Sequence, residues 1–203
     1  MISRQDVGIQ MDSLLAGNVS HIELINGELT RNTTALNFVN AAANAQGQIT
    51  IKGSQVVGAT DAIKIANSAV GGNTTVSVVD SQISYTGASG IQLANSAADP
   101  NTRVFMEFVR SHISNITATA VDLNATNGSK TYFDARDSSF SHGTTLLKTS
   151  GNSRVAVSLI RSDFRHEIPD KCLSAAEPII VLPTLRPARR RAQPRRRRRQ
   201  TAG

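Results

Sequence analysis

Two segments, AIKIAN at 62–67 and VSVVDSQI at 76–83, contain the pattern that decides the fold. The pattern returns directly afterwards as GIQLAN at 90–95 and MEFVRSHI at 106–113. Each copy holds three apolar pieces: a small residue with two alternating apolar positions, a second alternating piece, and a Ser-x-apolar or Gly-x-apolar triplet. Because one copy is too short to bury a core alone, a repeat of this kind indicates copies stacked on one another.

The triplet sets the length of the repeat. We call its first residue the anchor; the anchors are Gly27, Ser54, Ser81, Ser111, Ser138 and Ser162. Successive anchors are therefore 27, 27, 30, 27 and 24 residues apart. The extra length follows Asn95 while the strand spacings hardly change, so we expect insertions at one corner only. In the sixth copy Lys148 stands where an apolar residue is expected, which predicts a frayed terminal coil.

Apolar residues alternate with a period of two inside each piece, which predicts strands rather than helices. Val, Ile and Phe dominate these pieces, and Gly, Asn, Ser and Thr fill the gaps, where turns need them. We therefore predict an all-β chain, with a single-stranded parallel β-helix of about six coils over residues 1–167. A leucine-rich repeat has an overlapping period, but it needs a Leu-dominated core and usually a helical return.

Residues 168–203 differ in composition and form a second predicted region. They hold 10 Lys or Arg against 2 Asp or Glu, whereas residues 1–167 hold 12 against 13. The arginines are Arg186, Arg189, Arg190, Arg191 and Arg195–Arg199. Such a run repels itself and predicts a disordered, low-complexity tail. Three interpretations stay open: a tail without specific function, non-specific polyanion binding through these arginines, or an out-of-frame translation of GC-rich DNA.

The residue before each anchor forms a column of alternating charge, which reads Asp80, Arg110, Asp137 and Arg161. On successive coils this order predicts a surface ladder of ion pairs. The ladder also fixes the stacking, because a slip of one coil would bring like charges together. A second column of Asn40, Asn67 and Asn95 predicts either an amide ladder or a row of sugar-binding amides.

The competing hypothesis makes the charged face a site. Its candidate residues are Asp80, Glu107, Arg110, Asp134 and Asp137. Carboxylates in this number would bind Ca²⁺ and deprotonate an acidic sugar, with the arginine as electrostatic partner. The four histidines, His21, His112, His142 and His166, fall at different repeat positions, which gives no metal site. Apart from that possible Ca²⁺, no cofactor is predicted.

The segments at 90–93 (GIQL) and 76–81 (VSVVDS) resemble those of bacterial right-handed parallel β-helix repeat proteins of the pectin-lyase-like superfamily. The resemblance covers about residues 7–167. It implies a right-handed coil and a secreted or cell-surface location. It also implies a range of roles, from polysaccharide lyases, glycosidases and epimerases to tailspikes and surface proteins. The Asn-Thr-Asp, Asp-Asp and Gly-His-Gly sets of polygalacturonase-like members and the Arg-x-Pro-x-x-Arg of pectate-lyase-like members are absent, so no catalytic residue carries over.

We therefore predict a non-catalytic β-helix module of a secreted or surface protein, with polysaccharide as a candidate partner. The alternatives are a polysaccharide-active enzyme that uses the charged face, and polyanion binding by the tail. No stretch approaches the roughly 20 apolar residues of a membrane span. Residues 1–10 show no signal peptide. They also leave little room for a cap before the first strand, which predicts a fragment of a longer stack or a start assigned too far downstream.

Overall fold

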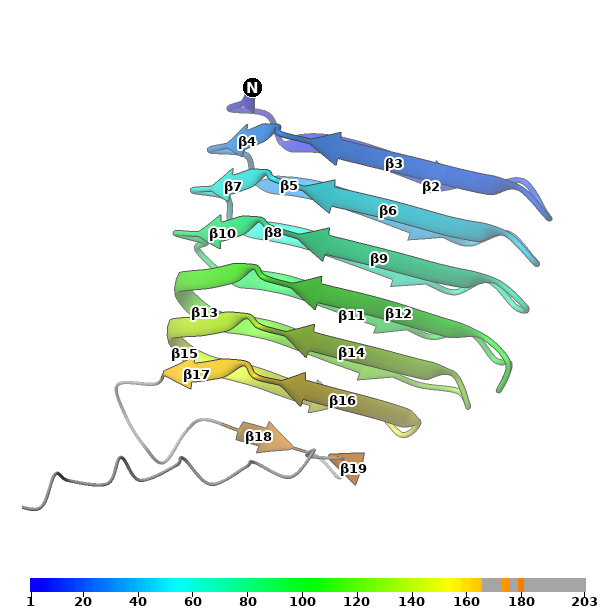
Figure 1. Cartoon of the computed structure of the whole chain (residues 1–203). Coiled ribbons are helices and arrows are strands. Elements are labelled where there is room, and N and C mark those ends of the chain that lie inside the picture. Colours follow the sequence, from blue (N-terminus) through cyan, green and yellow to red (C-terminus); the bar gives the residue numbers. More distant parts are fainter. Residues whose placement is uncertain (166–172, 176–178, 181–203) are drawn as a thin grey trace, which may run out of the picture.

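A computed structural model describes residues 1–165, 173–175 and 179–180, the last two segments through their backbone only. The boundary predicted at 167, the arginine tail, Cys172 and His166 lie outside the described residues. The described chain is a parallel β-helix of about six coils, and every strand pair in it is parallel (Figure 1). The predicted fold is confirmed. The coil winds right-handed, as crossovers between parallel strands do.

Each coil has three faces, and equivalent strands of successive coils stack on each face. The first face holds β2 (Val7–Ser13), β5 (Thr34–Asn40), β8 (Asp61–Asn67), β11 (Ser89–Asn95), the second half of β13 (His112–Ala125), the second half of β15 (Ser139–Ser150) and β18 (Leu173–Ala175). The second face holds β3 (Val19–Ile25), β6 (Gln46–Lys52), β9 (Asn73–Val79), β12 (Arg103–Val109), β14 (Lys130–Arg136), β16 (Arg154–Ile160) and β19 (Ile179–Ile180). The third face holds β1 (Ile2–Ser3), β4 (Glu28–Thr30), β7 (Gln55–Val57), β10 (Gln82–Ser84), the starts of β13 and β15, and β17 (Asp163–Arg165).

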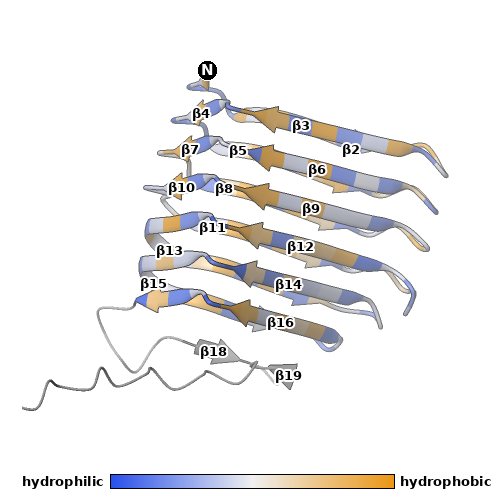
Figure 2. Ribbon diagram, in the orientation of Figure 1, coloured by the Kyte–Doolittle hydropathy of each residue, from blue (hydrophilic) through white to orange (hydrophobic). Residues whose placement is uncertain are grey.

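The core is a narrow column of aliphatic side chains between the faces. Along β9, for example, Val76 and Val78 are fully buried, while Ser77 between them points outward. Figure 2 shows this alternation of apolar and polar residues along the strands. Each inward aliphatic contributes about 1.5–3 kcal/mol on burial. In the C-terminal coils, phenylalanines take over the core, and the rings of Phe140 and Phe164 stack with centroids 4.3 Å apart.

The anchor serines form a continuous hydrogen-bonded ladder. Each Oγ accepts a bond from the backbone N–H of the anchor one coil earlier. The distances from N to Oγ are 3.1 Å (Gly27–Ser54), 3.1 Å (Ser54–Ser81), 3.0 Å (Ser81–Ser111), 3.2 Å (Ser111–Ser138) and 3.3 Å (Ser138–Ser162). Each hydroxyl also donates to the carbonyl two residues earlier, at 2.8 Å in the four central coils between Ser54 and Ser138. Serine is therefore the repeat's anchor because its hydroxyl is both acceptor and donor where the main chain turns.

Two corners of every coil are made by a residue with positive φ. The anchor corner precedes the anchors and consists of Asn26, Gly53, Asp80, Arg110, Asp137 and Arg161, with φ of 45–58°. The second corner, between the third and first faces, consists of Arg4, Arg31, Gly58, Tyr85, Asn115 and His142, with φ of 55–69°. Gly, Asn and Asp adopt this backbone more readily, whereas arginine and tyrosine do so at a cost. Backbone bonds between coils hold the corners in place; for example, the Asp80 N–H donates to the Val109 carbonyl at 3.0 Å.

Two details of the expected repeat are wrong. Lys148 does not replace an apolar residue: it pairs in register with outward Asp122, and its Nζ lies 3.0 Å from an oxygen of that carboxylate. Between Ile116 and Thr119 the pairing of β13 with β15 shifts by one residue. The anchors of these two coils lie before this shift, so their spacing does not reveal it. Insertions are also not confined to one corner, because Val57–Ser84 and Asp61–Ser89 are pairs in register, so that the second corner is one residue longer in the later coil.

Strand pairing also extends beyond the strands expected from the repeat. β1 pairs with β4, although the first strand was expected only near Gly8. At the other end, β18 pairs with β15 and β19 with β16. The described residues form no helix, and so none that could span a membrane.

Candidate functional site

The predicted carboxylate–arginine site separates into two groups of ion pairs. At the anchor corner, the Arg110 guanidinium donates to both oxygens of Asp80, at 2.6 and 2.8 Å. One coil further on, Arg161 binds Asp137 in the same way, with Nη2 2.7 Å from Oδ2. Hydrogen bonding from these arginines holds the pKa of Asp80 and of Asp137 below the ordinary value. The column is therefore a ladder of bidentate pairs on the surface.

Glu107 and Asp134 lie away from that column, on the outer side of the second face. They are register partners on β12 and β14. Arg136, which the sequence prediction left out, donates to Asp134 at 2.5 Å and lies 3.9 Å from Glu107. Asp134 is only 13% exposed beneath this arginine. The arginine that serves these two carboxylates is thus Arg136 and not Arg110.

This arrangement offers little acid–base chemistry. Asp80 and Asp137 each accept from a guanidinium with both oxygens, whereas Asp134 accepts through Oδ2 alone, and its buried Oδ1 has no hydrogen-bond partner among the described residues. Within the described part of the chain, no three His, Cys, Asp or Glu side chains lie together in a way that would hold a metal ion.

A different feature of the second face forms a concave site, which we call the aromatic groove. It is a hollow of about 510 Å³ lined by Gln46, Asn73, Thr75, Arg103, Phe105 and Tyr132. These residues come from β6, β9, β12 and β14, and all occupy outward positions of the strands. A smaller hollow of about 190 Å³ continues from the same two rings to Asp134, Ala156 and Ser158.

The geometry of the groove is set by strand register. Phe105 and Tyr132 are register partners, so the two residues lie on neighbouring strands, which are about 4.8 Å apart along the stack. The Arg154 guanidinium lies 6.0 Å from the centre of the Tyr132 ring, within cation–π range. Asn73 holds the backbone of Arg103 through a 3.1 Å bond from N–H to Oδ1. The groove thus presents two half-exposed rings beside amide, hydroxyl and guanidinium groups.

The sequence contained a signal for this groove, although the prediction missed it. With a period of two, Phe105 and Tyr132 fall at outward positions, where the neighbouring coils carry Gln48 and Thr75. An aromatic residue at an outward position of two consecutive coils departs from the repeat. It gains no core burial there.

The asparagine column has a structural role. Asn40, Asn67 and Asn95 are all at most 1% exposed, so the interpretation as a sugar-binding row is wrong. Their amides donate mainly to carbonyls of the following turn, as Asn40 does to Ala45 at 3.0 Å. Among the described residues, one bond joins two asparagines of the column, from Asn67 Nδ2 to Asn95 Oδ1 at 3.3 Å.

Two histidines that the sequence places at different repeat positions interact electrostatically: His112 on the third face and His142 at the second corner. His112 Nδ1 lies 2.5 Å from Ser139 Oγ, its register partner on the next coil. Partial burial, together with the charge of His142, lowers the pKa of His112.

Comparisons of this chain with protein-family models, with curated proteins and with solved structures give no match. The likeness to the pectin-lyase-like superfamily therefore stays an expectation from the repeat.

Proposed function

We propose that this chain is a non-catalytic β-helix module of a secreted or surface protein, and that it binds a polysaccharide along the aromatic groove. The observation that carries the proposal is the pair of rings, Phe105 and Tyr132, on neighbouring coils within one 510 Å³ hollow. Binding sites combine apolar, often aromatic, lining with a few polar groups that fix orientation. The groove has that composition.

A sugar ring suits these groups for two reasons. Its C–H faces pack on aromatic rings, and its hydroxyls bond to amides, hydroxyls and guanidinium groups such as Gln46, Thr75 and Arg103. The strands that carry the two rings also repeat at about 4.8 Å, close to the length of one sugar residue. A glycan lying along the stack would therefore place successive residues over successive coils.

The proposal is tested by affinity electrophoresis through gels that contain a soluble polysaccharide. The panel combines neutral polymers (β-glucan, xylan, galactomannan) with acidic ones (polygalacturonate, alginate). We expect at least one polymer to retard the wild-type chain, and Phe105→Ala or Tyr132→Ala to weaken that binding about tenfold, equivalent to about 1.4 kcal/mol. The matched control is Tyr85→Ala, because Tyr85 is the other tyrosine and is 64% exposed at the second corner. No retardation by any polymer, or equal loss in all three variants, would refute the proposal.

The enzyme alternative is tested on the same panel by measuring reducing ends and unsaturated products, with and without Ca²⁺. It predicts turnover that Asp134→Ala abolishes. The ion pairs described above favour the binding module, because a carboxylate held by a guanidinium is a weak base. Turnover by the wild-type chain would reverse that preference.

A further inference from the structure

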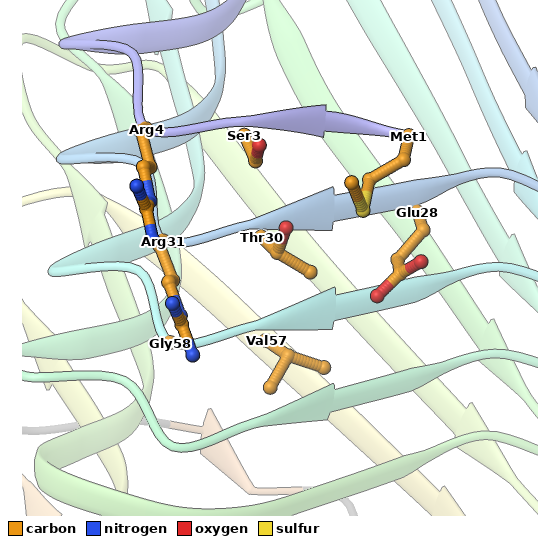
Figure 3. A pocket seen from close by; sticks show the side chains of 8 residues that line it. All are labelled: Met1, Ser3, Arg4, Glu28, Thr30, Arg31, Val57 and Gly58. Carbon is orange, nitrogen blue, oxygen red and sulfur yellow. The ribbon is translucent and has the colours of Figure 1, made fainter.

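A second hollow lies on the outer side of the third face, in the first coils. It has a volume of about 560 Å³ and is lined by Met1, Ser3, Arg4, Glu28, Thr30, Arg31, Val57 and Gly58 (Figure 3). Figure 3 shows Ser3, Thr30 and Val57 along the middle, with Arg4 and Arg31 on one side and Met1 and Glu28 on the other. The aromatic groove, by contrast, lies on the second face.

The two arginines are presented from a fixed backbone. Both occupy the second corner, one coil apart, with φ of 61° and 55°. The Arg4 N–H donates to the Thr30 carbonyl at 3.1 Å, and the Arg31 N–H to the Val57 carbonyl at 2.9 Å. The next residue of the column is Gly58, and a Cβ there would lie 3.7 Å from Cγ of Arg31. The Arg31 side chain thus extends over a residue that has no side chain of its own, and the two guanidinium groups lie in one file (Figure 3).

This pair of arginines departs from the charge pattern of the other corner. Arg110 and Arg161 each bind an aspartate on the neighbouring coil. Within the described residues, Arg4 and Arg31 have no carboxylate at ion-pairing distance. Two like charges on adjacent coils repel each other, and the positive φ of a charged residue adds backbone strain. The turn does not require an arginine, because Gly58 makes the same turn with neither the charge repulsion nor the backbone strain.

We propose that this hollow binds a phosphate group, either free or as a monoester. Two guanidinium groups match its double negative charge and supply donors in the geometry that phosphate prefers. The hydroxyls of Ser3 and Thr30, register partners on the floor of the hollow, supply further donors. The carboxylate of Glu28 on the opposite side repels any second anionic group, so the site selects one isolated phosphate over a polyanion.

The test is isothermal titration of the full chain with inorganic phosphate and with methyl phosphate at constant ionic strength. Binding of both probes identifies a monoester site, and binding of inorganic phosphate alone identifies a site for the free ion. We expect saturable binding, which Arg4→Gln or Arg31→Gln weakens about tenfold. We expect sulfate to compete with phosphate for the site and acetate not to compete. We also expect Glu28→Gln to increase the affinity for pyrophosphate.

The matched control is Arg103→Gln, which removes one exposed arginine from the aromatic groove and leaves phosphate binding unchanged. The arginines at 186–199 add the same background phosphate binding in every variant. The difference in phosphate affinity between variants therefore measures the contribution of the hollow. Absence of saturable binding, or an equal effect of Arg103→Gln and Arg31→Gln, would overturn the proposal. Its failure leaves the polysaccharide proposal untouched, because the glycan assay does not depend on Arg4 or Arg31.

Discussion

Ser81→Ala tests whether the anchor ladder holds the coils together. The Ser81 Oγ accepts the Ser54 N–H at 3.1 Å and donates to the Val79 carbonyl at 2.8 Å. The side chain is 6% exposed, so water cannot replace the lost acceptor without opening the stack. Alanine keeps its own N–H and the fold's shape, but it leaves the N–H of Ser54 buried without a partner.

The expected cost of Ser81→Ala is about 1–3 kcal/mol of unfolding free energy, the penalty for a buried donor left unsatisfied. In a chain of this size each kcal/mol lowers Tm by about 2–4 °C, so the shift is roughly 2–12 °C. Ser111→Ala removes the acceptor of a different donor, the N–H of residue 81. Because the two serines belong to one hydrogen-bonded ladder, the loss in the double variant should differ from the sum of the two single losses.

Far-UV circular dichroism during heating and urea titration measures the effect. Midpoints are compared rather than extrapolated free energies, because stacked repeats do not always unfold in one step. The control is Ser77→Ala on the outer side of β9, where the described structure shows no hydrogen bond through the side chain. That change should stay within about 0.5 kcal/mol. If Ser81→Ala unfolds at the same midpoint as Ser77→Ala, the ladder contributes nothing and the explanation of the anchor is wrong.

Three further predictions address the core, the charged column and the histidines. Val78→Asp places a charge in the dry core and should lower the free energy of unfolding by about 4 kcal/mol or more. The control is Val79→Asp, which lies one residue along, faces outward and should leave the chain folded. Equal effects of the two changes would contradict the alternation of inward and outward residues. Asp80→Arg sets a second arginine beside Arg110 and should lower the thermal midpoint, which the added change Arg110→Asp should restore; a double variant as unstable as the single one would show that the pair is not coupled. The pKa of His112 lies below its ordinary value of 6.5 because the side chain is partly buried, so the unfolded chain binds a proton more readily than the folded chain. Stability should therefore fall as the pH drops through that value, and His112→Gln should flatten this part of the pH profile of Tm. An unchanged profile would assign the slope to other groups.

The fold was predictable because stacking leaves a direct trace in the sequence. The period of two predicted the strands, and the anchor spacing predicted the length of the coil. The alternating charges of Asp80, Arg110, Asp137 and Arg161 predicted a column of ion pairs, which the structure confirms. Positive φ at these two corners was not predictable, because arginine and aspartate stand there more often than glycine and asparagine. The register of Lys148 was missed because a one-residue shift inside β13 and β15 leaves the anchors in place.

The site was less predictable than the fold, and the reason is the reach of side chains. Sequence position placed Glu107 and Asp134 on the same face as Arg110, but the arginine that binds Asp134 is Arg136, two residues along its own strand. Likewise, the concavity around Phe105 depends on which outward neighbours are large and which are small, across four coils.

In a stacked fold, the residue at each repeat position meets its equivalents above and below, and stability alone favours partners that satisfy one another. Serine on serine and aspartate on arginine follow that rule here. Paired outward rings at Phe105 and Tyr132 gain no core burial, and paired arginines at Arg4 and Arg31 repel each other. Where a column lowers stability and no contact within the fold compensates for it, we expect a bound ligand to provide the stabilising contact. Because these two columns lie on different faces, Tyr132→Ala should leave phosphate binding intact and Arg31→Gln should leave glycan binding intact; loss of both activities in either variant would point to unfolding rather than to two sites.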